Sequence, residues 1–215
     1  MPPETDSLIA SRIAQSLSEL YKDSLLLPPL NYGVSTEHND FNATVTSNTP
    51  NYLSFVSTLL DSITIESAMV VIINGHGGNI NILRAIESDY NYKNTTTKLL
   101  IPPIYNDKVI AHSHELFGEF DTHAGSVEAS LLAYYGLSKK DKVTLEDEGY
   151  VKKMSGSLRF FRMSEISEKG VIKDTNKLII DSLLGEDLHR LIVAQLKLEI
   201  DNTLKNINRI SNAIK

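Results

Sequence analysis

The sequence predicts an α/β fold in which a mostly parallel sheet has helices on both faces. Two apolar segments, residues 68–74 and 97–103, show no alternation of polar and apolar side chains. Such runs are typical of strands that are buried on both faces. Amphipathic helical patterns lie before and after these segments. Apolar strands that alternate with such helices indicate a parallel sheet covered on both sides.

The first elements of the chain are two helices with a short strand between them. Residues 7–21 predict a helix with one apolar face, and Thr5 or Asp6 is the expected N-cap. Residues 24–29, Ser-Leu-Leu-Leu-Pro-Pro, predict a short buried strand that the prolines end. A loop follows, and a second helix is expected over residues 50–62.

The later elements are helices separated by two long irregular stretches. The predicted helices cover residues 79–92, residues 125–136, where Gly136 closes the helix, and residues 185–210. Residues 105–121 and 149–174 lack clear periodicity. We expect them to be active-site loops, because long loops in compact α/β domains are often functional.

Length and composition indicate one globular domain over residues 1–215. The chain is 41% hydrophobic, has a formal net charge of −6 and carries no dense Lys/Arg run, which argues against nucleic acid or a membrane as a partner. It has no cysteine, which excludes disulfides and thiolate metal sites. No secretory leader or spanning segment is visible. We therefore expect a cytoplasmic protein that acts on a small molecule.

His76 lies in the stretch Asn-Gly-His-Gly-Gly-Asn, residues 74–79, where a buried strand turns into a helix. Parallel sheets bind ligands at the carboxyl ends of their strands, and glycines let a ligand or a second loop approach closely. Two interpretations stay open. The turn could hold a phosphate at a helix N-terminus, although it matches neither the dinucleotide nor the P-loop pattern. Alternatively, His76 is a metal ligand or a catalytic base.

Two further segments place histidines beside acids at the ends of predicted elements. They contain Glu37, His38 and Asp40, and Asp121, His123 and Glu128. Imidazole and carboxylate groups are ligands for zinc, manganese and iron. The plainer interpretation makes the carboxylates helix caps and solvated loop charges. His189, on the last helix, is predicted to be a surface residue, and the pattern assigns no role to His112 and His114.

Four segments, in this order along the chain, together resemble the creatininase (creatinine amidohydrolase) family. The family's marks are Leu-Pro-x-x-Thr-Asp-x-x-Ile-Ala, Pro-Pro-x-x-Tyr-Gly-x-Ser-x-Glu-His, Asn-Gly-His-Gly-Gly-Asn and His-Ala-Gly-x-x-Glu-x-Ser. The matching segments are residues 1–10, 28–44, 73–79 and 121–131. Asn42-Ala43 stands where the family usually has Pro-Gly. The resemblance covers residues 1–135 strongly and the remainder only in general character.

The resemblance implies a metal-dependent hydrolase of C–N amide-type bonds with a three-layer αβα domain that assembles into rings, often hexamers. It implies that Asp6 and His76 bind a divalent zinc, iron or manganese ion. Glu128 would be a further metal ligand or a catalytic carboxylate, and His123 would act on the substrate or the leaving group. The residues expected to contact the substrate are Glu37, His38, Gly77, Gly78 and Asn79.

One family segment is not found in this sequence. A Glu-x-His-Gly segment, which supplies two more metal ligands, normally lies a few residues before Leu-Pro-x-x-Thr-Asp, and Met1 occupies that leucine position. The resemblance therefore implies that the first strand of the sheet is missing from the chain. We expect the reading frame to continue upstream, with an apolar strand followed by Glu-x-His-Gly; the alternative is a degenerate family member.

The resemblance also allows a prediction of the substrate. Family members open a cyclic amide, deformylate a formamidopyrimidine nucleotide in archaeal flavin and deazaflavin synthesis, or cleave a modified peptide. Gly-His-Gly-Gly-Asn in place of His-Tyr-Glu-Asn argues against creatinine, and a glycine-rich turn at a helix N-terminus suits a phosphate-bearing substrate. We therefore predict deformylation of a formamidopyrimidine ribonucleotide. The alternatives are cyclic amide hydrolysis and a non-catalytic, ring-forming protein.

Overall fold

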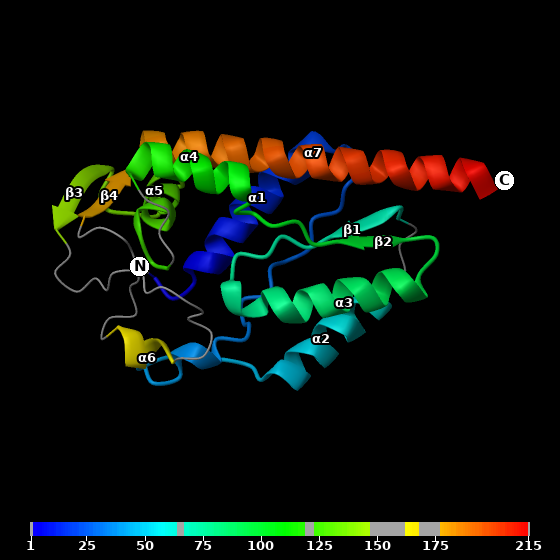
Figure 1. The fold of residues 1–215 in the computed structure, drawn as a ribbon, viewed down its shortest axis with the longest axis horizontal. Coiled ribbons are helices and arrows are strands. Elements are labelled where there is room, and N and C mark those ends of the chain that lie inside the picture. Colours follow the sequence, from blue (N-terminus) through cyan, green and yellow to red (C-terminus); the bar gives the residue numbers. More distant parts are fainter. Residues whose placement is uncertain (1, 64–66, 119–122, 147–161, 168–176, 215) are drawn as a thin grey trace.

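Two short parallel strands separate two layers of helices in the computed structural model (Figure 1). The structure describes residues 2–63, 67–118, 123–146, 162–167 and 177–214. Strand β1 (Met69–Val71) pairs in parallel with β2 (Lys98–Leu100), and Met69 stands opposite Lys98. The α/β class and the existence of these two strands are thus confirmed, although of their residues only Leu99 is fully buried and the others are partly buried.

The helices fall into a layer on each face of this strand pair. The first layer contains α1 (Thr5–Leu20), α4 (Asp107–Phe117), α5 (Ser126–Tyr134) and α7 (Ser182–Ile214). The second contains α2 (Thr49–Asp61) and α3 (Ile80–Lys93). The shorter elements are the 3-10 turns η1 (Thr36–His38) and η2 (Gly77–Asn79), helix α6 (Met163–Ile166), and strands β3 (Lys142–Glu146) and β4 (Lys177–Asp181).

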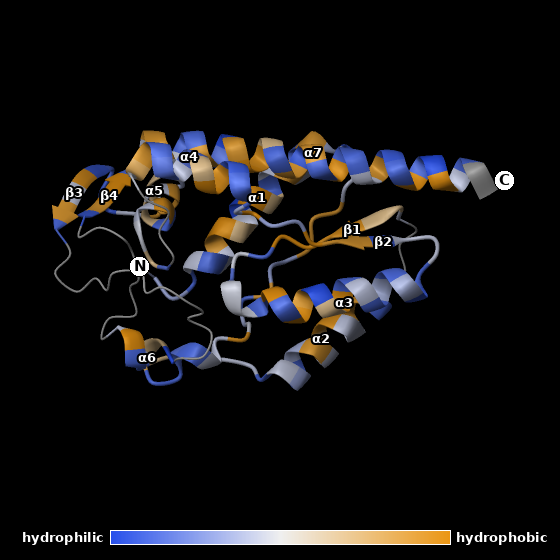
Figure 2. Ribbon diagram, viewed as in Figure 1, coloured by the Kyte–Doolittle hydropathy of each residue, from blue (hydrophilic) through white to orange (hydrophobic). Residues whose placement is uncertain are grey.

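Alternate side chains of β1 enter different hydrophobic cores. Met69 and Val71 pack against the core formed with α1, α4, α5 and α7, whereas Val70 and Ile72 pack against the core formed with α2 and α3. Figure 2 shows the strand pair in mostly apolar colours between helices that carry both kinds of residue. The apolar packing on both faces explains why the segment shows no alternation, and it supports the predicted layering.

The long helix α7 holds the first layer together. It buries Leu188, Ile192, Leu196 and Ile200, which recur every four residues and so lie along one face. These side chains share a core with Ile9 and other residues of α1 and with α5. No helix among the described residues is long and apolar enough to cross a membrane.

Residues 24–29 do not form the predicted strand. Leu25, Leu26 and Leu27 are 66%, 49% and 58% exposed. A strand needs a neighbour with which its backbone can form hydrogen bonds, and no described segment pairs with these leucines. The prediction was therefore wrong, because a leucine run specifies a buried strand only where a sheet edge is beside it.

The predicted loop over residues 105–121 contains helix α4. The Asn106 side chain accepts hydrogen bonds from the amides of Lys108 and Val109, and Gly118 ends the helix in the left-handed conformation (φ 76°). Both capping signals are visible in the sequence. Residues 119–121 of this first loop, including Asp121, lie outside the described residues. Of the second predicted loop, only residues 162–167 are described, and they contain α6.

Strands β3 and β4, which the sequence analysis did not predict, pair antiparallel, and β4 packs on α5. His189 is 7% exposed, so its predicted surface position was wrong. Its Nε2 lies 3.0 Å from Ser16 Oγ, and its Nδ1 lies 2.9 Å from Tyr135 Oη. Helix α7 is covered by α1 and α5 at this level, which the pattern of α7 alone does not reveal.

Candidate active site

Predicted site residues from four segments of the chain gather near the carboxyl end of β1. His76 follows β1 and precedes η2, and Asp6 lies in the first turn of α1. Glu37 and His38 belong to η1, and His123 precedes α5. The carboxyl end of a parallel strand is where such folds bind ligands. The structure therefore brings distant candidates to the expected place.

His76 has a partner on each ring nitrogen. Its Nδ1 lies 2.9 Å from Asp6 Oδ2, and its Nε2 lies 2.9 Å from the carbonyl oxygen of Val34. Ser35 Oγ is 3.0 Å and Glu37 Oε1 is 3.7 Å from Nε2. Because a carboxylate and a carbonyl can only accept, both nitrogens can donate when the ring is protonated.

These contacts also set the charge of His76. Burial alone would lower its pKa, but the hydrogen bond and negative charge of Asp6, aided by the Val34 carbonyl and Glu37, outweigh burial and raise the pKa of His76 above its ordinary value. Asp6 was expected to be a possible helix cap. Instead, Glu4 occupies the N-cap position of α1, which leaves the Asp6 carboxylate to His76.

The glycines beside His76 let two backbone segments approach it. A Cβ atom at Gly75 would overlap the Asp6 carbonyl, and one at Gly78 would overlap the Val34 carbonyl and the His76 ring. At Gly77 a Cβ atom would have no neighbour within 4 Å. Two of the glycines therefore admit the segments that contact His76, as the second-loop interpretation requires, and Gly77 alone faces open space.

His38 and His123 form the second part of the cluster. Their rings stack with centroids 4.9 Å apart and planes inclined by 25°. Burial lowers the pKa of His38, against the opposing charge of Glu37. Burial also lowers the pKa of His123, and the nearby His38 lowers it further. Both rings are thus favoured in the neutral form, whereas His76 is favoured in the protonated form. Opposite shifts within one cluster are typical of acid–base sites.

The backbone is strained beside both loops of the cluster. The described residues other than glycine with positive φ are Ala43 (φ 68°) and Ala124 (φ 60°). Ala124 directly follows His123, and Ala43 ends the loop that contains Glu37 and His38. A left-handed alanine is unfavourable by about 1–2 kcal/mol and persists only where the surroundings impose it. Strain of this kind concentrates at functional sites.

Two other predicted residues have positions that bear on their roles. Asn79 is buried; its Oδ1 accepts a hydrogen bond from the Val34 amide, and its Nδ2 donates to Asn74 Oδ1. The side chain therefore holds the Val34 segment beside His76. Glu128 is half-buried in the first turn of α5, a helix that packs against α1, which carries Asp6. The roles assigned to both residues stay predictions.

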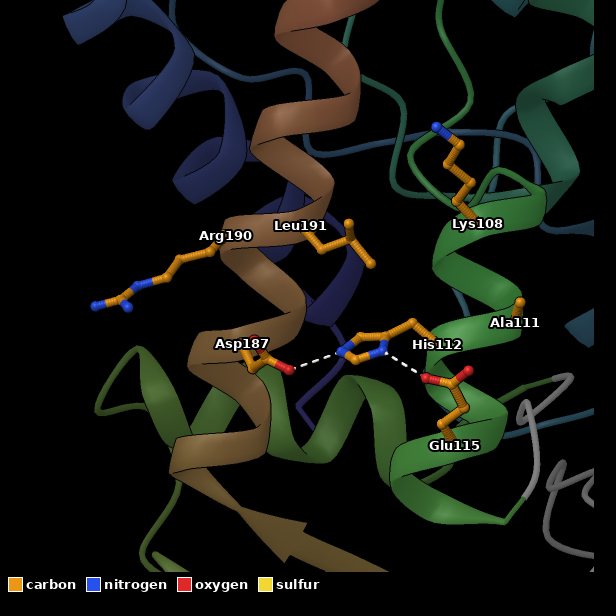
Figure 3. A pocket seen from close by; sticks show the side chains of 7 residues that line it. All are labelled: Lys108, Ala111, His112, Glu115, Asp187, Arg190 and Leu191. Atoms are coloured by element: carbon orange, nitrogen blue, oxygen red, sulfur yellow. Dashed lines mark hydrogen bonds and ion pairs between the residues drawn. The ribbon is translucent and has the colours of Figure 1, made fainter.

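Sequence reasoning did not single out the contacts of Val34 and Ser35 with His76. Ser35 is part of the Tyr-Gly-x-Ser motif, which was the available signal. The contact with the Val34 carbonyl could not be predicted from the sequence, because every residue has a backbone carbonyl. His112 also has contacts that the sequence did not indicate. On the shallow surface between α4 and α7 it lies 2.6 Å from Asp187 and 3.1 Å from Glu115 (Figure 3).

The Asp6–His76 pair fits part of a metal centre. A carboxylate oxygen and an imidazole nitrogen are donors that zinc, iron and manganese bind, and here Asp6 Oδ2 and His76 Nδ1 lie 2.9 Å apart. The Nε2 bond to Val34 is the kind of outer hydrogen bond that orients a metal-binding histidine. Among the described residues, however, no three His, Asp or Glu side chains are arranged to hold a metal ion. The pair thus supplies an incomplete ligand set.

Comparisons with known proteins agree on one family. The family model described as creatinine amidohydrolase matches residues 1–197. The mycofactocin precursor peptide peptidase of Mycolicibacterium smegmatis is 26% identical over 183 residues, which are 81% of this chain and 68% of that protein. Its counterpart in Mycobacterium ulcerans is 24% identical over 184 residues, with the same shares.

A solved structure has a similar fold. A Bacteroides fragilis protein, to which the name creatinine amidohydrolase has been provisionally given, superimposes with a TM-score of 0.65. The match covers 89% of this chain and 79% of that one at 17% sequence identity. At this identity the likeness concerns the fold alone.

Proposed function

The chain belongs to the creatininase family, and from this premise we propose that it is a metal-dependent hydrolase of C–N amide-type bonds. The observation that carries the proposal is the cluster at the end of β1. There His76 contacts Asp6, and His38 stacks on His123. A histidine–carboxylate pair beside two neutral imidazoles has the groups that amide hydrolysis requires.

Asp6 Oδ2 and His76 Nδ1 would hold the divalent zinc, iron or manganese ion, with Glu128 as the further predicted ligand. When bound, such an ion supplies a Lewis acid for the substrate carbonyl. His76 must lose its Nδ1 proton to bind, so the affinity should fall at acidic pH. The Val34 carbonyl and Asn79, which holds that segment, keep the ring in its orientation.

His123 is the group that we propose moves the proton. The neutral ring favoured by its lowered pKa can accept a proton from the attacking water. The same nitrogen then donates that proton to the departing nitrogen as the C–N bond breaks, so the histidine returns to its neutral state. The stacked ring of His38 holds His123 in place, and Glu37 offers an acceptor to the attacking water or the substrate.

Two substrate classes are consistent with this chemistry. The curated relatives are described as peptidases of a precursor peptide, which favours a peptide bond. The sequence analysis favours the formamide of a formamidopyrimidine ribonucleotide, and the open space at Gly77 leaves room for a substrate group at the start of η2. By family resemblance, we also propose a homo-oligomer, a hexamer, which light scattering would test.

Turnover assays distinguish the substrates. The purified chain, supplied in turn with Zn²⁺, Fe²⁺ and Mn²⁺, would be given a formamidopyrimidine ribonucleotide, a peptide and creatinine. Formate release, a new amino terminus and creatine identify the three reactions. We expect turnover of one substrate and its loss in His123→Ala. No turnover of any of them by a chain with bound metal would favour the non-catalytic alternative.

Metal analysis tests the binding role of His76 separately. His76→Ala should contain less metal than the wild-type protein, because one of two paired donors is removed. His114→Ala is the control, since His114 is exposed on α4. Equal metal content in the wild type and in His76→Ala would contradict the role.

A further inference from the structure

Asp40 joins two parts of the chain that are far apart in sequence. Ser164 Oγ donates a hydrogen bond to Asp40 Oδ2 at 2.5 Å. Arg162 Nη1 lies 3.3 Å from Oδ2 and 3.4 Å from Oδ1. Both partners lie at the start of α6, which Figure 1 shows beside the turn that contains η1. The carboxylate thus connects α6 to the segment that carries Glu37 and His38.

The contacts on the α6 side form a small network. The Arg162 amide donates to Glu165 Oε2 at 2.8 Å, and the Arg162 guanidinium lies 3.9 Å from Glu165 Oε1. Glu165 therefore restrains both the backbone and the side chain of Arg162. Because its donors are restrained in this way, the start of α6 presents Arg162 and Ser164 to the Asp40 carboxylate as one unit.

On the other side, Asp40 belongs to the same continuous turn as the site residues. The His38 amide donates to the Ser35 carbonyl at 3.0 Å, and the Phe41 amide donates to the His38 carbonyl at 2.9 Å. These bonds enclose Asp40 between residues 38 and 41, so a shift of Asp40 moves His38 with it. The turn has no strand partner among the described residues. The Ser47 amide closes its base by donating to the Gly33 carbonyl at 2.9 Å, the Thr44 hydroxyl donates to the His38 carbonyl at 2.9 Å, and Asp40 adds the link to α6.

The position of the turn that contains η1 determines two contacts of the candidate site. His38 stacks on His123, and Glu37 Oε1 lies 3.7 Å from His76 Nε2. Aromatic rings attract one another at centroid distances of about 4.5–7 Å, so a displacement of the turn by a few ångströms would end the contact. An exposed ion pair contributes little to stability, so the contact of Asp40 with Arg162 is better explained by the position that it fixes.

We propose that Asp40 is a positioning residue, which ties η1 to α6 and thereby holds His38 against His123 and Glu37 beside His76. The role in turnover rests on the proposed function, whereas the role in holding the two rings does not. Small displacements of acting groups lower the rate strongly, up to about a hundredfold for 1 Å. Loss of Asp40 should therefore affect kcat rather than KM.

The test compares Asp40→Ala and Asp40→Asn with Asp89→Ala. Asparagine keeps an oxygen that accepts from Ser164 but loses the charge that attracts Arg162. Asp89 forms an exposed ion pair with Lys93 on α3 and is the matched control. The first readout, which needs no substrate, is the NMR cross-relaxation between the ring protons of His38 and His123. The second is kcat and KM on the substrate that the turnover assays identify.

We expect the cross-relaxation to vanish in Asp40→Ala, to weaken in Asp40→Asn and to persist in Asp89→Ala. The value of kcat should fall by roughly tenfold to a hundredfold in Asp40→Ala with little change in KM. The double variant Arg162→Gln, Ser164→Ala should reproduce the effect, and combining it with Asp40→Ala should add nothing further. If Asp40→Ala fails to fold, the same two measurements on Asp40→Asn and on the Arg162→Gln, Ser164→Ala double variant test the proposal.

Unchanged cross-relaxation and unchanged kcat in a folded Asp40→Ala would overturn the proposal. So would additive effects of the Asp40 and Arg162–Ser164 changes. Lost cross-relaxation in a chain that hydrolyses none of the substrates would contradict the proposed function and would still support the positioning role.

Discussion

Ala43 takes the left-handed conformation at the end of the loop that carries Glu37 and His38 (φ 68°). The creatininase family usually has glycine at this position, and the structure supplies the reason, because glycine has no Cβ atom to clash in that region. The sequence shows which residue stands there but not the φ angle that makes it unfavourable. Ala124, beside His123, has the same property (φ 60°).

Replacing Ala43 with glycine should stabilise the protein. Relief of the left-handed conformation gains about 1–2 kcal/mol, and the greater freedom of glycine in the unfolded chain offsets about 0.5–1 of this. Ala85→Gly, at an exposed position inside α3, should instead destabilise by about 1 kcal/mol. Urea unfolding of both variants measures the difference. A stability loss in Ala43→Gly would mean that the φ angle is not imposed on this residue.

The three glycines beside His76 should respond differently to alanine. Gly78→Ala places a methyl group on the Val34 carbonyl and the His76 ring, and overlap of this kind costs about 1–3 kcal/mol. Gly75→Ala meets the Asp6 carbonyl and should behave similarly. Gly77→Ala meets nothing within 4 Å and should keep the fold. Thermal unfolding and metal content test the set; equal effects at Gly77 and Gly78 would contradict the close approach.

At the scale of elements, helices α1, α5 and α7 enclose a buried polar group. His189 of α7 contacts Ser16 of α1 and Tyr135, the residue that follows α5. Burial lowers the pKa of His189, so the folded protein holds this ring neutral. The unfolded chain protonates it with an ordinary pKa of about 6.5. Between these two values the unfolded state binds more protons than the folded state does.

This group should therefore make the folded state less stable as the pH falls below about 6.5, and more stable as it rises. The pH dependence of the unfolding free energy should be compared between the wild type and His189→Asn. The other histidines contribute equally to both proteins, so the difference isolates His189. His112, whose pKa is raised chiefly by Asp187, acts in the opposite direction in both. The unfolding free energy at pH 8 minus that at pH 5 should be smaller in the variant than in the wild type. An unchanged difference would show that His189 is not held neutral.

At the scale of the whole molecule, strand β1 has one edge that pairs with β2 and one that pairs with no described strand. The Lys98 amide donates to the Ala68 carbonyl, and the Ile72 amide donates to the Leu100 carbonyl. Alternate residues of a parallel strand bond in opposite directions, so the backbone groups of Val71 face away from β2. Both faces of β1 pack against a hydrophobic core, while this edge has no strand beside it among the described residues.

An apolar strand followed by Glu-x-His-Gly, joined ahead of residue 1, should stabilise the protein and tighten metal binding. The added strand would give the outward-facing backbone groups of Val71 hydrogen-bond partners, and each such bond contributes about 0.5–1.5 kcal/mol. Two further ligands would complete the ion's coordination. Urea unfolding and metal titration measure both effects, and the same extension with proline in the strand is the control. Equal stability with either extension would show that the open edge of β1 does not pair with the added strand.

Local patterns in the sequence determined most of the helices. The apolar spacing of α1, α2, α3, α5 and α7 predicted each of them to within a few residues, because one face of each helix must be buried wherever it packs. The caps of α4 were visible and were overlooked. Ordered motifs also identified the family and the candidates Asp6, Glu37, His76 and His123, since those motifs record which residue types stand at strand ends.

Only the tertiary structure decided what depends on segments far apart in the chain. Residues 24–29 have the composition of a strand, but a strand requires a ladder partner, and composition does not supply one. His189 is buried because α1 and α5 cover that turn of α7. His38 meets His123 because η1 and the start of α5 converge, and Asp40 contacts Arg162 because α6 returns to η1. Such contacts arise from the packing of separate elements, and no short window of sequence contains both partners.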